Sequence, residues 1–170
     1  NKQINLIKAD GTTPQDWKFK ESSGKIKQAI KFYRVNGKDY LVASDAKQCY
    51  FLDRRGRNRL IPKKNIIPSA NNLIYIDDFS SQKRFVMSSP DGTIVYLHQD
   101  GNVLSIKTTK RDKNHAFVVC KSKQKTYYAF YDTQGFTLYD TELESIIEDN
   151  TVNSGKSPKC ETYNNYIGIY

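Results

Sequence analysis

The chain has 170 residues, which is enough for one domain with a substantial core. Hydrophobic residues make up 38% and charged residues 26%, a composition that excludes an intrinsically disordered chain. No apolar run approaches the ~20 residues that a membrane helix needs, so we expect no membrane insertion within this segment. The formal net charge of +9 favours an acidic partner such as nucleic acid, an anionic glycan or a membrane surface.

Short apolar segments separated by turn residues run along the whole chain and predict strands. "INLIKADGTTPQDWKF" (4–19) predicts two strands around an Asp-Gly turn. "IKFYRV", "DYLVAS" and "CYFLDRRGRNRLI" predict four more, with a hairpin turn at 36–38. "LIYIDDF", "RFVMSS" and "VYLHQDGNVLSI" predict the next four, with a turn at 90–92. "AFVVC", "TYYAFY" and "FTLYDTELESII" follow with a turn at 132–135, and "CETYNNYIGIY" ends the chain as two strands around Asn164-Asn165.

These segments form a repeat. Gly11, Gly56 and Gly101 are 45 positions apart, and Glu142 holds the equivalent place 41 positions later in a fourth copy. The approximate repeats are 1–25, 26–64, 72–110, 114–150 and 158–170, all within one propeller-like domain or propeller segment. "TELESIIEDN" (141–150) has a competing signal, because Thr141 and Glu144 form a helix capping box. Both a fourth strand and a short helix stay open there.

The inner strands of each repeat, such as "YLVA" and "YYAFY", are apolar on both faces, as strands buried on both sides are. The sequence therefore predicts an all-β fold, a β-propeller-like stack of four-stranded antiparallel meanders with about three complete blades and two half blades. The half blades could close a small ring of four blades. The alternative, which we favour because the chain begins with Asn1 rather than Met, is an arc cut from a larger propeller. Such an arc would tend to self-associate.

"DWKF" (16–19), "FYRVNGKDYLVASDAKQCYFLDRRGRNRL" (32–60) and "DGTIVYLHQDGNV" (91–103) resemble the C-terminal propeller-like region of large envelope-associated proteins of unknown function from Bacteroidetes. This resemblance implies the fold and a cell-envelope or periplasmic location, and it implies no chemistry. A looser similarity runs to quinoprotein and WD-type repeats. Only the first copy keeps the tryptophan of the quinoprotein pattern, as Trp17, so we expect no quinone cofactor.

No catalytic or metal-binding pattern is apparent. His98 and His115 lack a second histidine or a carboxylate at metal spacing, and Asp77 and Asp78 would point to opposite faces of a strand. "SGKS" (154–157) lacks the first glycine of a phosphate-binding loop. Cys49 and Cys120 lie in apolar runs and are expected to be buried thiols, and Cys160 makes the number of cysteines odd. We expect no cofactor and no metal.

Two basic clusters are the remaining feature. The first consists of Arg54, Arg55, Arg57, Arg59, Lys63 and Lys64 around the turn of the second copy, and it is the candidate site for an anion or a partner. The second consists of Lys107, Lys110, Arg111 and Lys113. Solvated charges on edge strands are the simpler interpretation of both.

We therefore expect a non-catalytic binding or scaffolding module of a larger protein, with a protein partner. One alternative is a basic propeller that binds an acidic polymer or nucleic acid, and a second is a fragment of a quinoprotein-like enzyme.

Overall fold

The computed structural model describes residues 2–78, 83–122, 125–150, 160–163 and 166–169, and these residues form an all-β structure without a helix. Three four-stranded antiparallel sheets follow one another along the chain, each with its strands in sequence order. The first contains β1 (Lys31–Val35), β2 (Lys38–Ser44), β3 (Cys49–Leu52) and β4 (Asn58–Leu60). The second contains β5 (Tyr75–Asp77), β6 (Arg84–Ser88), β7 (Ile94–Leu97) and β8 (Val103–Ile106). The third contains β9 (Ala116–Lys121), β10 (Thr126–Asp132), β11 (Gly135–Tyr139) and β12 (Ser145–Asp149).

A two-stranded hairpin follows these sheets, as the sequence predicts. It consists of β13 (Cys160–Tyr163) and β14 (Tyr166–Ile169), and β13 lies near β9 of the third sheet. The predicted turn at 164–165 lies outside the described residues, as do 151–159 with the "SGKS" stretch. No ladder joins residues 4–10 to β14 in the part of the chain that the structure describes, so ring closure is not seen there.

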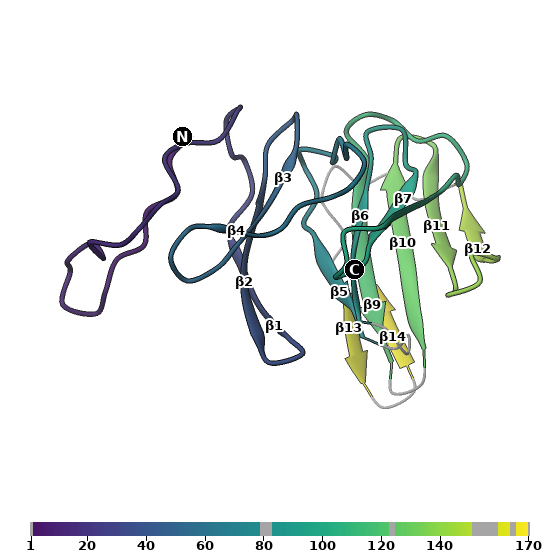
Figure 1. Cartoon of the computed structure of the whole chain (residues 1–170). Coiled ribbons are helices and arrows are strands. Elements are labelled where there is room, and N and C mark those ends of the chain that lie inside the picture. Colours follow the sequence, from purple (N-terminus) through teal and green to yellow (C-terminus); the bar gives the residue numbers. More distant parts are fainter. Residues whose placement is uncertain (1, 79–82, 123–124, 151–159, 164–165, 170) are drawn as a thin grey trace.

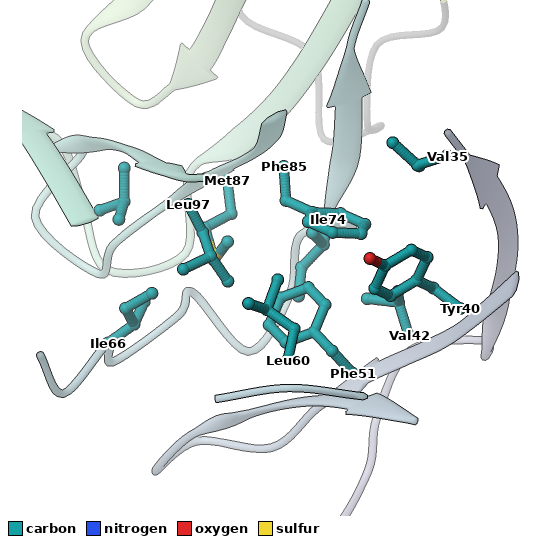
Figure 2. Packing of buried hydrophobic residues seen from close by; sticks show 11 residues of the cluster. Val35, Tyr40, Val42, Phe51, Leu60, Ile66, Ile74, Phe85, Met87 and Leu97 are labelled. Carbon is teal, nitrogen blue, oxygen red and sulfur yellow. The ribbon is translucent and has the colours of Figure 1, made fainter. Parts of the chain in front are cut away.

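The sheets pack face to face in sequence order (Figure 1). One core joins the first sheet to the second, and Phe85 of β6 is at its centre. The ring of Phe85 lies 4.6 Å from that of Phe51 and 5.2 Å from that of Tyr40, measured between centroids (Figure 2). A second core joins the second sheet to the third through Tyr96, Phe117, Tyr128 and Phe130. Because the middle sheet is buried on both faces, its strands read as unbroken apolar runs.

The outer faces of the stack are covered as well. On the first sheet, Ala43, Tyr50 and Leu52 are buried beneath residues of the N-terminal segment such as Ile4 and Trp17. This segment, residues 2–26, was predicted to contain two strands, and that prediction is wrong because none of its residues joins a ladder. Isolated hydrogen bonds hold it instead, among them Trp17 Nε1 to the carbonyl oxygen of Ile4 at 3.0 Å.

The hairpin turns explain the spacing of the glycines. Asn36 and Gly37 both have positive φ, as a two-residue turn of type I′ requires, and the turns at 90–92 and 132–135 also join paired strands.

In the turn between the third and fourth strands, the N–H of Gly56 or Gly101 donates to the carbonyl oxygen three residues earlier. In the fourth copy Leu143 makes this bond with φ 64°. Leu143, and not Glu142, is therefore the equivalent of the glycines, and 141–150 contains a strand rather than a helix.

Candidate functional site

An open groove of about 470 Å³ lies between the N-terminal segment and the third and fourth strands of the first sheet. Its apolar lining comes from Phe19, Tyr50 and Leu60. The rings of Phe19 and Tyr50 meet edge to face, with centroids 5.4 Å apart. Tyr50 is fixed further by a hydrogen bond from its hydroxyl to Asp45 Oδ2 at 2.7 Å, so this side of the groove is rigid.

Cationic side chains line the same groove. Lys18, Lys20 and Arg57 are exposed, and neither lysine forms a salt bridge within the described residues. The backbone N–H of Lys18 donates to the carbonyl oxygen of Arg55 at 2.8 Å, which holds the N-terminal segment against the β3–β4 turn. Gly56 permits this approach, because a Cβ there would lie 2.8 Å from the backbone nitrogen of Phe19.

Asp53 organises the turn beneath the groove. Its Oδ1 accepts hydrogen bonds from the backbone N–H of Arg55 and Arg57, at 2.8 and 3.0 Å, and Arg57 Nε donates to Oδ2 at 2.8 Å. Burial alone would raise the pKa of Asp53, but the bonds from Arg57 and Arg55 outweigh it and hold the pKa below its usual value. The turn therefore keeps its shape and its carboxylate charge at neutral pH.

A second groove of about 420 Å³ occupies the equivalent place on the second sheet. Six of its lining positions, Asn65, Ile66, Thr93, Val95, Val103 and Ser105, lie 45 residues after lining positions of the first groove. The repeat read from the glycines is thus also a repeat of surface shape. The chemistry differs, because Asn65 and Ile66 stand where the first groove has Lys20 and Glu21, and none of the described residues that line the second groove is a lysine or arginine.

The basic cluster predicted as a candidate site is exposed, but much of its charge is paired. Arg54 pairs with Asp39, Arg55 with Asp16 at 3.0 Å and Arg57 with Asp53 at 2.8 Å. The guanidinium of Arg59 lies 5.8 Å from the centroid of the Tyr40 ring. Lys63 Nζ donates to Asn102 Oδ1 at 3.1 Å, and Lys64 is exposed. Only Arg57 of this cluster lines the groove.

The second basic cluster is divided. Lys107, Lys110 and Lys113 are exposed, whereas Arg111 is buried, so the interpretation of Arg111 as a solvated charge is wrong. Its guanidinium lies 3.8 Å from Asp132 and 5.3 Å from the centroid of the Phe130 ring. Burial of an arginine requires such partners, and this pair joins the loop before β9 to β10.

The structure brings together one polar network that the sequence does not reveal. His115 is fully buried, its Nδ1 lies 2.7 Å from the carbonyl oxygen of Asp112, and its Nε2 lies 3.0 Å from Ser88 Oγ. Since a carbonyl can only accept, Nδ1 carries the proton, and Ser88 donates to Nε2. Asn72 donates to Ser88 Oγ at 3.1 Å and accepts from the N–H of Phe117 at 2.9 Å. The network joins the second and third sheets, and burial of Ser88 and His115 keeps this pair away from solvent.

The remaining sequence candidates have local roles. Asp77 is buried and bound to Arg84 at 2.9 Å, whereas Asp78 is exposed and bound to Lys121 at 2.6 Å, so adjacent carboxylates do point to opposite faces. His98 is half-buried in the β7–β8 turn, where its backbone N–H donates to the carbonyl oxygen of Asn102.

Two cysteines differ in state. Cys49 is a free thiol that lies 3.5 Å from Met87 Sδ, and burial raises its pKa well above the usual range. Cys120 is buried as predicted, but it is disulfide-bonded and is therefore not a free thiol.

Comparison with known proteins gives no relative. No protein family model matches the chain, and no curated protein or solved structure matches it. Among the described residues no cluster of three or more His, Cys, Asp or Glu side chains could hold a metal ion. Nor does that part of the chain contain a helix that could span a membrane.

The cationic side of the groove was missed at the level of sequence, although a signal is present. In "KFK" (18–20) and "KIK" (25–27) the lysines alternate with Phe19 and Ile26, which pack onto the first sheet while all four lysines are exposed. Alternation of this kind in an extended segment places the charges on one face. The arginine run at 54–59 is the denser cluster of basic residues in the sequence, but Arg54, Arg55 and Arg57 form ion pairs in the structure.

Proposed function

We propose that the chain is a non-catalytic binding or scaffolding module, built as a β-propeller-like stack of meanders, whose cationic groove takes an acidic partner. The observation that carries this proposal is that Lys18 and Lys20, which form no salt bridge with any described residue, border an open groove with an aromatic and aliphatic lining. A carboxylate-bearing side chain beside an apolar one matches these two properties. A protein partner with an acidic, partly apolar segment has this chemistry.

The disulfide supports a location for this module. Disulfide bonds persist in oxidising compartments and are rare in the cytosol. The bonded state of Cys120 is thus consistent with the cell envelope or periplasm that the family resemblance implies.

An acidic polymer, including nucleic acid, is the second candidate partner. The exposed lysines at positions 18, 20, 25 and 27 favour it, because side chains two residues apart on an extended chain recur every ~6.6 Å along one face. Two pairs of closely spaced cations of this kind suit a linear polyanion.

Retention on immobilised polyanions tests both candidates. Columns carrying polyglutamate, a sulfated polysaccharide and single-stranded DNA are compared with the native protein and with the double variant Lys18→Glu, Lys20→Glu. The matched control is Lys107→Glu, Lys110→Glu, which makes the same charge change on exposed residues of the third repeat. We expect the groove variant to elute at lower salt than the control.

The preferred column identifies the class of partner. Stronger retention on polyglutamate favours a protein partner, and stronger retention on the polysaccharide or DNA favours the polymer. Equal elution of the two double variants on every column contradicts the groove as the binding site.

A further inference from the structure

We infer that the acidic partner of the groove is strand β12 of a second copy of this chain, so that copies associate head to tail. This inference rests on the proposed function, because it names the partner of the same groove.

Charge is distributed unevenly along the stack of sheets. Residues 1–64, which form the N-terminal segment and the first sheet, contain 16 Lys and Arg and 6 Asp and Glu, a net charge of +10. Residues 123–150, which contain β10, β11 and β12, have 2 Lys and 6 Asp and Glu, a net charge of −4. Figure 1 shows the N-terminal segment and β12 on opposite sides of the molecule, so the net positive and net negative segments lie apart in space. Two such molecules attract each other end to end.

The anionic end has the form of a docking strand. Within the described residues β12 is an edge strand that pairs only with β11, and its residues Ser145 to Glu148 are all exposed. The turn and strand from Asp140 to Asp149 contain five acidic residues and no basic one. Glu142, Glu144 and Glu148 form no salt bridge within the described residues. An unpaired strand edge offers backbone donors and acceptors to an incoming chain.

Two isoleucines add apolar surface to this edge. Ile146 and Ile147 are each 49% exposed, and the register of β11 and β12 shifts at this point, which makes room for Ile146 outside the ladder. In the groove, Phe19, Tyr50 and Leu60 provide apolar surface next to Lys18 and Lys20. Ile146 and Ile147, which lie between Glu144 and Glu148, therefore match the apolar and cationic side chains that line the groove.

The arrangement of the sheets favours association between molecules. The groove is lined by the N-terminal segment and the first sheet, and β12 is the outer strand of the third sheet. Figure 1 shows the N-terminal segment on one side of the molecule and β12 on the opposite side. The two surfaces are different patches of one chain, so the contact is heterologous, and a pair of copies still has one free groove on one copy and one free β12 strand on the other.

Light scattering with size-exclusion chromatography, over a range of protein concentrations at low and high salt, tests the inference. We expect the native protein to grow in mass with concentration at low salt and to dissociate at high salt. Lys18→Glu with Lys20→Glu, and separately Glu144→Lys with Glu148→Lys, should each weaken association about tenfold or more, as expected for the loss of two ion pairs. An equimolar mixture of these two variants should recover a one-to-one complex. Lys107→Glu with Lys110→Glu should associate like the native protein.

A second variant examines the apolar part of the contact. Ile147→Ser keeps all charges and changes an exposed side chain, so the variant should fold and should associate more weakly than the native protein. A melting temperature for each variant separates loss of folding from loss of association.

Three outcomes overturn the inference. The first is a native protein that stays monomeric at low salt. The second is an equal effect of the control substitutions, and the third is failure of the charge-reversed pair to combine. If the native protein is monomeric but is still retained on the polyglutamate column through the groove, the inference fails and the proposed function stands. If neither occurs, both fail.

Discussion

At the scale of single residues, His115 determines how the contact between the second and third sheets responds to pH. The neutral ring satisfies the carbonyl of Asp112 and the hydroxyl of Ser88, and a second proton on Nε2 would displace the hydrogen bond from Ser88. Burial is the largest influence on His115 and lowers its pKa, while Asp132 and Asp91 oppose this effect and Arg111 adds to it. The folded protein therefore resists protonation at a point where the unfolded chain accepts a proton.

The sign of the pH dependence follows from this difference. The unfolded chain binds a proton near pH 6.5 that the folded protein does not bind, so the contribution of His115 to stability is complete above that pH. It is lost progressively as the pH falls from about 6.5 toward the lower pKa of the folded state. In measurements between pH 8 and pH 5, the urea concentration at the midpoint of unfolding should decrease as the pH is lowered through this window. The slope should vanish in His115→Gln and persist in the half-exposed control His98→Gln.

A second residue-scale comparison uses two ion pairs at the same ladder position. Arg34 of β1 is directly opposite Asp39 of β2, and Asp77 of β5 is directly opposite Arg84 of β6, with the signs exchanged. The side chain of Arg84 is 18% exposed and that of Arg34 is 63% exposed, whereas the partner carboxylates Asp77 and Asp39 are 2% and 11% exposed. Position in the ladder is thus equal and burial differs.

We expect Arg84→Met to destabilise the protein by about 3 kcal/mol, since it leaves a buried carboxylate without its guanidinium. Arg34→Met should cost less than about 1 kcal/mol, because Arg34 is exposed and Asp39 keeps Arg54. The free energy of unfolding in urea measures both. Equal losses would contradict the role of burial.

At the scale of elements, the turn glycines separate two reasons for a glycine. Gly11 and Gly101 occupy the same place in equivalent turns, with φ of 81° and 86°. A Cβ on Gly11 meets nothing within 4 Å, whereas a Cβ on Gly101 would lie 2.7 Å from the carbonyl oxygen of Ile61 in the chain leaving the first sheet. The N–H of Lys63 donates to the carbonyl oxygen of Gly101 at 2.8 Å, so this contact joins neighbouring repeats.

Gly11→Ala should therefore cost about 1–2 kcal/mol, the usual penalty of a left-handed backbone for a residue with a Cβ. Gly101→Ala should cost about 1–3 kcal/mol more, because the contact between the repeats must also open. Thermal unfolding of the two variants measures the difference. Identical melting temperatures would show that the contact with Ile61 is not needed.

The arginines around the β3–β4 turn provide the opposite case, in which many charges carry little stability. Arg54, Arg55 and Arg57 have side chains that are 68%, 60% and 59% exposed. Replacing these three and Arg59 together by Gln should change the free energy of unfolding by only a few tenths of a kcal/mol per residue. A loss of cooperative unfolding in the quadruple variant would show that the turn needs them.

The sequence is sufficient for the elements that local chemistry determines. Asn36-Gly37 and the Asp-Gly turns predict the hairpins, and apolar runs such as "IVYL" predict strands that are buried on both faces. The predicted strands in residues 4–19 are absent because a strand also needs a neighbour to pair with, which periodicity does not report. Ser88 and His115 are 27 residues apart, and their contact depends on how two sheets stack. The burial of Arg111 is missed for the same reason.

At the scale of the whole molecule, the disulfide of Cys120 is a covalent constraint on the third sheet. Cys49 is half-buried between the first two sheets, and burial raises its pKa well above the usual range, so little of the reactive thiolate forms at neutral pH. In the native protein we expect no rapidly reacting thiol, and in urea without reductant we expect one, that of Cys49, among the three cysteines. Reduction should destabilise the protein by about 2–5 kcal/mol, measured as a shift of the urea midpoint. Three reactive thiols in the unreduced, unfolded protein would contradict the disulfide.

Each described sheet is formed from strands that are consecutive in the chain, and every ladder closes between immediate neighbours. Pairing therefore requires only short loops to close, so the entropy lost in forming one sheet is small compared with that of a β-sandwich with distant partners. During synthesis the first sheet can form before the second has left the ribosome. A newly formed sheet still has one apolar face without cover, which the next repeat buries as it emerges. Folding of this kind proceeds sheet by sheet in the order of the chain. Slow synthesis between repeats would lengthen the time during which an apolar face is exposed and can aggregate.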